Sequence, residues 1–176
     1  MRKKSFPLLI LILFFSVKTN SFSKDFKLYS PNKQIEVQVQ VKDRLYYSVI
    51  YQQQQIISPS PISMVIDDGT VLGKIPVLSK NETKTVNEIL TPVIKVKTAT
   101  IKNNFNELIV HFKGDYALIF RAFDDGVAYR LATKFDKQLK ILEEEVTFNF
   151  IKDHHIYFPE EERLSVKLSG FLSIFI

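Results

Sequence analysis

Hydrophobic and polar residues alternate by twos through most of this chain, a pattern that is typical of β-strands. The clearest case is Ile35–Val41, in which every second residue is Ile or Val and the residues between them are Glu or Gln. One apolar and one polar face predict a half-buried antiparallel strand. After residue 23, no window of about 11 residues shows a helical period, so the pattern predicts an all-β fold.

The same alternation predicts a β-hairpin over residues 118–131. Its apolar positions are Leu118, Phe120, Ala122, Val127, Tyr129 and Leu131. The turn Asp124-Asp125-Gly126 is expected to supply the positive φ angles that a tight hairpin needs. A hairpin is not stable alone in water, so the other strands must supply the sheet on which it packs. The alternative is a functional turn, in which Asp124 and Asp125 face a ligand together with Arg121 and Arg130.

Further strands are predicted on both sides of this hairpin, at residues 45–51, 56–57, 62–66, 70–72, 83–90, 93–101, 107–112, 139–142 and 146–151. We expect a hairpin loop at residues 52–55, an interruption at the two prolines of residues 58–61, an Asp-Gly turn at residues 67–69 and a turn at Asn103-Asn104. About a dozen strands at spacings of roughly 8–12 residues indicate a sandwich or an open barrel. Their lengths favour two large packed antiparallel sheets.

Residues 1–23 are interpreted as a secretory signal peptide. Arg2, Lys3 and Lys4 form a basic start, residues 7–17 form an apolar segment, and Ser21 and Ser23 suit a cleavage after Ser23. An uncleaved anchor is the alternative, although the apolar segment is short for a bilayer. We therefore expect a secreted or periplasmic protein with no membrane span after cleavage.

Removal of this segment changes the charge of the chain. The whole sequence has 24 basic and 19 acidic residues, and the predicted signal peptide contains four of the basic ones and none of the acidic ones. The mature chain is therefore close to neutral, which argues against a nucleic-acid partner. The absence of cysteine excludes disulfides. Stability must come from packing.

The end of the chain, residues 163–176, differs from the rest because it closes on five hydrophobic residues out of six. Two interpretations stay open: a final edge strand, or the remnant of a chain cut short by a shifted reading frame. We expect one β domain over residues 24–162, followed by this divergent tail.

Several segments together resemble the N-terminal domain of glycoside hydrolase family 97. They are Ser30-Pro31 before residues 35–39, residues 45–49, Ser60-Pro61 before residues 66–73, residues 107–112, and most strongly residues 120–130. The similarity covers residues 26–162, with the segments in the family's order and spacing.

That resemblance implies a β-super-sandwich related to the galactose-mutarotase-like fold. In the family it precedes a (β/α)8 barrel, which carries the carboxylates that cleave α-glucosidic or α-galactosidic bonds, and a small C-terminal β domain. The N-terminal domain shapes part of the sugar pocket and packs on the barrel. This chain contains no barrel, so we expect no catalytic residue in it and no glycosidase activity from it alone.

The resemblance also implies a calcium ion beside the pocket of the full-length enzyme. In the family, a Glu of this domain shortly after a Phe-Pro segment reaches that ion. Glu160, Glu161 and Glu162 are the available carboxylates here, but residues 163–176 depart from the family pattern and the calcium ligand cannot be assigned. A run of charges is more often a solvated turn.

Sugar binding is the activity that the residues themselves could support. Carbohydrates need aromatic faces and charged hydrogen-bonding groups, and the candidates are Arg121, Asp124, Asp125 and Tyr129, with Tyr46, Tyr51, Tyr116 and Arg130 as further residues of suitable type. The competing interpretation is that the tyrosines fill core or cross-strand positions.

Two alternatives to the accessory domain stay open. One is a self-contained mutarotase-like enzyme, which would need a histidine acid and a carboxylate base, with only His111, His154 and His155 available. The other is a structural subunit that docks on a separately encoded barrel. The sequence has neither a Gly-x-Ser-x-Gly nucleophile turn nor a phosphate-binding glycine loop.

Overall fold

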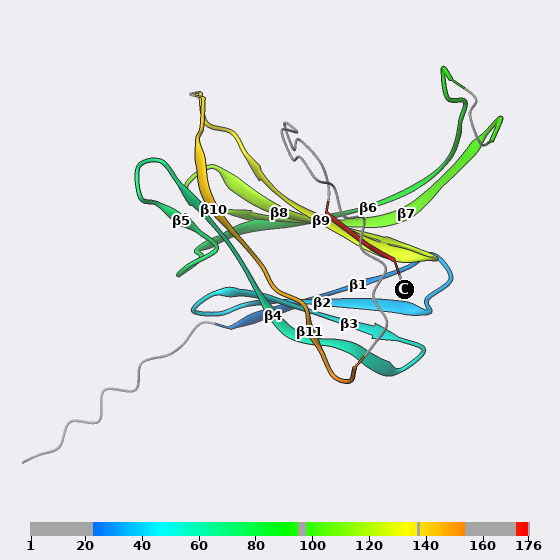
Figure 1. Ribbon diagram of the computed structural model, residues 1–176, viewed down its shortest axis with the longest axis horizontal. Helices are drawn as coiled ribbons and strands as arrows, with labels where there is room; N and C mark the ends of the chain where they lie inside the picture. The colour runs from blue at the N-terminus through cyan, green and yellow to red at the C-terminus, as the bar shows by residue number, and fades with distance from the viewer. Residues whose placement is uncertain (1–22, 95–97, 137, 154–171, 176) are drawn as a thin grey trace, which may run out of the picture.

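The protein consists of two antiparallel β-sheets packed face to face (Figure 1). The computed structural model describes residues 23–94, 98–136, 138–153 and 172–175, and every regular element in them is a strand. No helix in these ranges is long and apolar enough to cross a membrane. The predicted all-β sandwich of two antiparallel sheets is confirmed, whereas the predicted signal peptide lies almost entirely outside the described residues.

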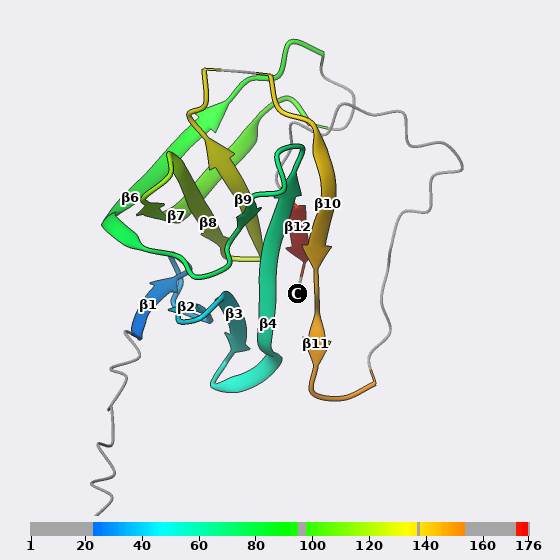
Figure 2. The ribbon, with the colours of Figure 1, turned by 90° about the vertical axis from the view of Figure 1, so that its left-hand side faces the viewer.

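The first sheet has the strand order β1-β2-β3-β4-β10, with the short strands β5 and β11 also paired to β4. Figure 2 shows β10 and β11 following one another along β4. The strands are β1 (Lys24–Tyr29), β2 (Ile35–Val41), β3 (Leu45–Tyr51), β4 (Gln54–Ile66), β5 (Val71–Leu72), β10 (Ile141–Val146) and β11 (Asn149–Phe150).

The second sheet has the strand order β12-β9-β8-β7-β6. Its members are β6 (Leu78–Leu90), β7 (Ile101–Phe112), β8 (Tyr116–Phe123), β9 (Gly126–Thr133) and β12 (Leu172–Phe175). The backbone of β12 pairs antiparallel with the outer side of β9. This pairing agrees with the interpretation of the chain end as an edge strand.

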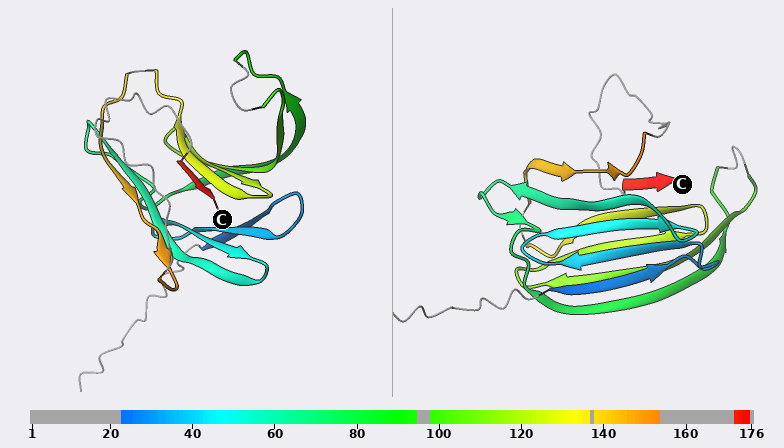
Figure 3. Two further views of the ribbon diagram at one scale, coloured as in Figure 1. Left: turned by 45° about the vertical axis from the view of Figure 1, so that its right-hand side comes forward. Right: turned by 90° about the horizontal axis from the view of Figure 1, so that it is seen from below.

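The two outermost strands on the other side, β6 and β7, extend beyond the rest of their sheet. Pairing between β7 and β8 begins at Phe105 and Phe123, so residues 87–90 and 101–104 pair only with each other among the described residues. We call these residues, with the described connecting residues 91–94 and 98–100, the arm. Figures 1 and 3 show that the arm curves away from the first sheet.

Alternate residues of both sheets form one core. Ile35, Val37, Val39 and Val41 are at most 1% exposed, as their alternation predicts. In the hairpin of β8 and β9, Leu118, Phe120, Ala122, Val127 and Tyr129 are equally buried. Leu131 is only partly buried and packs against the core.

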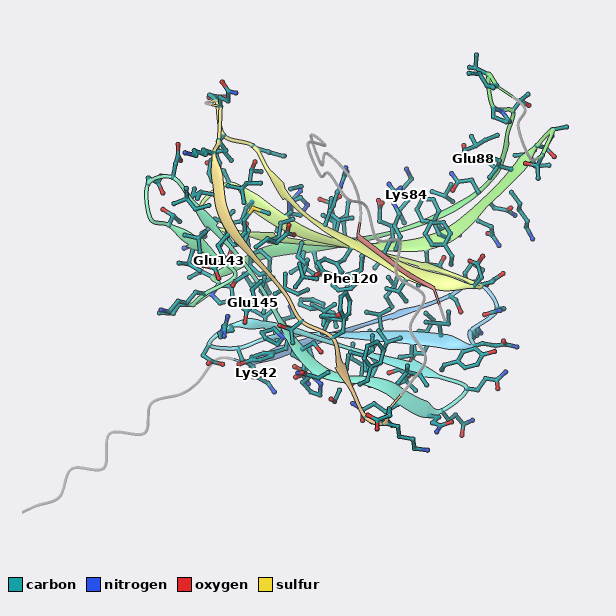
Figure 4. The ribbon with its side chains drawn as sticks, viewed as in Figure 1. Lys42, Lys84, Glu88, Phe120, Glu143 and Glu145 are labelled. Carbon is teal, nitrogen blue, oxygen red and sulfur yellow. The ribbon has the colours of Figure 1, made fainter. Side chains whose placement is uncertain are left out.

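Three aromatic rings join the two sheets at the centre. Tyr47 of β3 lies 5.7 Å from Phe120 of β8 and 5.5 Å from Tyr129 of β9, measured between ring centroids, and the last two rings are 5.4 Å apart. Figure 4 shows Phe120 between the sheets. Burial raises the pKa of both tyrosines above its usual value, so the phenols stay neutral.

The prediction that prolines interrupt the chain at residues 58–61 is wrong. Strand β4 runs through them, with Pro61 opposite Tyr46 and Ser60 opposite Tyr47. The β3–β4 register shifts directly afterwards, and on the other side the backbone N–H of Asn149 donates to the Ser60 hydroxyl. Proline is tolerated because the ladder is already irregular where its N–H is missing.

The connection between β6 and β7 also differs from the prediction. Residues 93 and 94 and residues 98–100 belong to no strand, whereas Asn103 and Asn104 lie inside β7 instead of in a turn. Cross-strand pairing explains the second error, because the Asn103 side chain donates to Glu88 Oε1 at 2.7 Å. Alternation alone cannot identify a strand when no neighbouring strand is available for it.

The last two predicted strands are also misplaced. Strand β10 begins at Ile141 and runs through three glutamates to Val146, and β11 covers only two residues. The predicted strands at residues 139–142 and 146–151 therefore have wrong bounds. Pairing with β4 holds both strands, and it does not depend on an apolar alternation of their own.

The two predicted Asp-Gly turns differ in their backbone φ angles. The turn at residues 67–69 has the predicted glycine geometry, with φ at Gly69 of 82°. The turn between β8 and β9 joins the predicted strands, but Gly126 has no positive φ, because it already lies in β9. Two consecutive positive φ angles occur in another hairpin, at Gln52 and Gln53 between β3 and β4, with values of 47° and 67°.

The central tyrosines give a matched pair of variants for stability. The Tyr47 hydroxyl donates to the Thr147 carbonyl oxygen at 3.0 Å, whereas the buried Tyr129 hydroxyl has no hydrogen-bond partner among the described residues. We expect Tyr47→Phe to lower the free energy of unfolding by about 1 kcal/mol, and Tyr129→Phe to leave it unchanged or raise it. Urea denaturation measures both. An equal loss in the two variants would contradict this assignment.

Candidate functional site

The second sheet has one face in the core and one face turned away from it. Along β7 and β8, the residues that alternate with the core residues pair across the two strands. We call this surface the outer face; it is formed by Phe105, Glu107, Ile109 and His111 of β7 and Ala117, Ile119, Arg121 and Phe123 of β8. It lies on the inner side of the bend that carries the arm (Figures 1 and 3).

An ion pair lies at the middle of the outer face. Glu107 and Arg121 are direct partners in the β7–β8 register, and Arg121 Nε donates to Glu107 Oε2 at 2.6 Å. Glu107 is only 6% exposed. Because this carboxylate is buried, the guanidinium replaces contacts that water would otherwise make with it.

Two aromatic rings adjoin this pair. The Arg121 guanidinium lies over the ring of Phe105, 4.5 Å from its centroid, and Phe105 lies 5.1 Å from Phe123. The guanidinium is thus fixed by a carboxylate and by a ring face. Together the four side chains form a rigid surface that is apolar at one end and charged at the other.

The turn between β8 and β9 borders this surface and carries Asp124 and Asp125, both exposed. Asp124 Oδ1 accepts a hydrogen bond of 2.8 Å from the backbone N–H of Asn32, in the turn between β1 and β2. A second link lies nearby, where the Asn106 side chain donates to the Tyr29 carbonyl oxygen at 2.8 Å. Asp124 therefore fastens one sheet to the other, whereas Asp125 is exposed at the same turn.

Tyr129 lies on the opposite side of its sheet from Arg121. It is 1% exposed and packs against Tyr47 and Phe120. In that position its ring is a core contact and has no free face for a sugar. The structure therefore brings Arg121 together with the Asp124–Asp125 turn but not with Tyr129.

His111 of β7 and Glu82 of β6 lie next to each other on the same surface. His111 Nε2 lies 3.3 Å from Glu82 Oε1, but without hydrogen-bond geometry. Lys80 lies 2.6 Å from the same carboxylate and lowers its pKa below the usual value. Glu82 is therefore ionised at neutral pH and can accept a proton but not donate one.

A shallow groove of about 240 Å³ lies where the edge strands of the two sheets approach each other. It is lined by residues 27–29 of β1, residues 83–85 of β6, and Asn106 and Glu107 of β7. Its lining is a mixture of polar and apolar side chains. Its open shape lacks the enclosure that a tight small-molecule site needs.

The predicted calcium candidates Glu160, Glu161 and Glu162 lie outside the described residues, as do His154 and His155. Within residues 23–94, 98–136, 138–153 and 172–175, no group of three or more His, Asp or Glu side chains could hold a metal ion.

Sequence reasoning identified Arg121 but missed its partners. The signal was present, because strands 107–112 and 116–123 flank the turn at Gly114-Asp115, and a tight turn there places Glu107 opposite Arg121. The pairing of Phe105 with Phe123 was not predicted, because a turn was expected at Asn103-Asn104, directly before Phe105. The pairing register of the two strands is therefore sufficient to predict the ion pair, but not its burial.

Residues 28–169 match the protein family described as Glycosyl-hydrolase 97 N-terminal. The chain is 34% identical over 153 residues to a retaining alpha-galactosidase of Bacteroides thetaiotaomicron, and the match covers 87% of this chain but only 22% of that enzyme.

Solved structures show the same fold. A glycoside hydrolase family 97 enzyme from Pseudoalteromonas sp. strain K8, in complex with acarbose, has a TM-score of 0.60 at 21% sequence identity. The match covers 68% of this chain and 19% of that enzyme. A beta-arabinopyranosidase has a TM-score of 0.64 at 24% identity, over 72% of this chain and 21% of its own length.

The ion pair on the outer face predicts a large effect of removing its cation. We expect Arg121→Met to lower the free energy of unfolding by about 2–3 kcal/mol at pH 7, because the Glu107 carboxylate would stay desolvated without a partner. The double variant Glu107→Gln/Arg121→Met should recover at least half of that loss. Urea denaturation measures both.

Lys84→Met is the matched control, since Lys84 lies opposite Glu107 on β6 and is exposed (labelled in Figure 4). It should change stability by less than about 0.5 kcal/mol. A double variant no more stable than Arg121→Met would show that the isolated carboxylate is not the cause.

Proposed function

This chain belongs to the glycosyl-hydrolase 97 N-terminal family, and from that premise we propose that it is the non-catalytic, carbohydrate-associated domain of an α-glycosidase. In this role it packs on a (β/α)8 catalytic barrel and shapes part of the sugar pocket. The observation that carries the proposal is the coverage: the family match spans most of this chain, while the chain spans 22% of the related galactosidase.

The chemistry of the outer face supports a non-catalytic role. Hydrolysis of a glycoside needs one carboxyl group that donates a proton and a second that acts as base or nucleophile across the bond. Arg121 donates a hydrogen bond to the Glu107 carboxylate, and Lys80 lowers the pKa of Glu82. Glu82 is therefore poorly suited to donate the proton.

The substrate class that we propose for the complete enzyme is an α-glucoside or α-galactoside. The Bacteroides relative is a retaining alpha-galactosidase, and the Pseudoalteromonas structure holds acarbose. Arg121 and Asp125 are the residues of this domain that we propose to lie nearest the sugar, with Asp124 fixing the turn that carries Asp125. We propose a secreted or periplasmic location from residues 1–23, and calcium as a component of the full-length enzyme.

The proposal predicts that the purified chain alone does not hydrolyse p-nitrophenyl α-glucoside or α-galactoside. We expect release of p-nitrophenol at the rate of the buffer, because the acid and base of the reaction belong to the barrel. The galactosidase of Bacteroides thetaiotaomicron serves as the positive control. Hydrolysis that copurifies with this chain and is lost in Glu107→Gln would overturn the proposal.

The His111–Glu82 pair favours one second candidate, a mutarotase-like enzyme. A histidine and an ionised carboxylate on one sheet face are the acid and base that sugar ring opening requires. His111 is partly buried, however, and Glu82 is engaged by Lys80. We therefore rank this candidate below the accessory domain.

Polarimetry separates the two candidates. The mutarotase predicts faster interconversion of α-D-glucose and β-D-glucose than in buffer, with a loss of at least about 100-fold in His111→Ala. Lys84→Ala is the control, since Lys84 lies on the same surface and outside the pair. The accessory domain predicts no acceleration by any of the three proteins.

A further inference from the structure

The tip of the arm concentrates exposed apolar side chains. Five of them, within residues 89–101, are between 43% and 102% exposed: Ile89, Leu90, Val93, Ile94 and Ile101. We call these five residues the tip patch. Contiguous exposed apolar surface on a protein marks an interaction site more often than an accident of sequence.

The tip patch is apolar on both faces of the arm. Leu90 pairs with Ile101 across the two strands, and these residues share the outer-face side with Phe105, which lies four residues from Ile101 on β7. Ile89 points to the other side, because neighbouring residues in a strand alternate. A two-stranded ribbon is marginally stable in water without a surface to pack on. A partner that receives this tip can therefore bury apolar side chains on both of its sides.

We infer that the tip patch is the docking element for the catalytic part of a family 97 hydrolase; this inference rests on the function proposed above. The match covers 22% of the related galactosidase and 19% of the Pseudoalteromonas enzyme, so about four-fifths of each enzyme lies outside the match and can supply a large partner for this domain. The arm leaves the sandwich on the side away from the first sheet (Figure 3). Docking there leaves the core undisturbed.

A second copy of this chain is the less suitable occupant. The edge strand β6 leads into the arm, and it carries Lys80, Glu82, Lys84 and Glu88 (Lys84 and Glu88 are labelled in Figure 4). Charged side chains along an edge strand oppose pairing with another edge. The apolar contact is therefore limited to the tip, which suits insertion into a groove better than a sheet extended between two copies.

The test uses the full mature chain and the part of the Bacteroides thetaiotaomicron galactosidase that follows its matching region, immobilised after its folding has been checked by a thermal melt. Surface plasmon resonance measures binding of the wild-type chain, of Val93→Ser/Ile94→Ser, and of Ile141→Ser/Leu142→Ser. The last is the matched control, since Ile141 and Leu142 are 51% and 56% exposed on β10. All four substituted side chains are exposed, so the variants should melt like the wild type.

We expect the tip variant to bind at least tenfold more weakly than the wild type, and the control to bind within twofold of it. Equal binding of all three proteins would overturn the docking role of the tip while leaving the proposed function intact. Absence of wild-type binding would overturn both. Wild-type dimers in light scattering that are lost in the tip variant would identify a second copy as the occupant and overturn the inference.

Discussion

The contact of Tyr47 with Phe120 and Tyr129 is the interaction on which the rest of the structure depends. It is the point where a strand of the first sheet meets two strands of the second, with ring centroids within 5.7 Å. The chain has no cysteine, so no disulfide can replace this packing. Large aromatic side chains bury much area and fix the geometry of their neighbours.

That contact also determines which surface is left for function. A strand presents its side chains to two faces, and in β8 the core takes Leu118, Phe120 and Ala122. Arg121 is consequently directed to the outer face, where Glu107 and Phe105 hold it. The functional proposal is therefore a consequence of the packing: the side of the sheet away from the core remains to meet a partner, and the arm extends from that same sheet.

Much of the fold could be predicted because the alternation at residues 35–41 and 118–131 reports directly on burial. The errors have a common cause, since pairing is a property of two strands and the alternation describes one. Residues 58–61 stay extended because β3 and β11 accommodate the prolines, and Asn103 belongs to β7 because it pairs with Glu88. For the site, residue type alone suggested Tyr129 as a sugar-binding residue, but its side chain is buried in the core. Residue type also gave no indication that Glu107 is buried.

The central claim is that this sandwich presents the arm and the outer face to a catalytic neighbour. Hydrogen–deuterium exchange of the full chain, with and without the catalytic part of the related galactosidase, tests it most directly. The account predicts slower exchange in the arm and at residues 121–125, with the first sheet unchanged. Slower exchange confined to β1, β2 and β3, or no change at any segment, would contradict it.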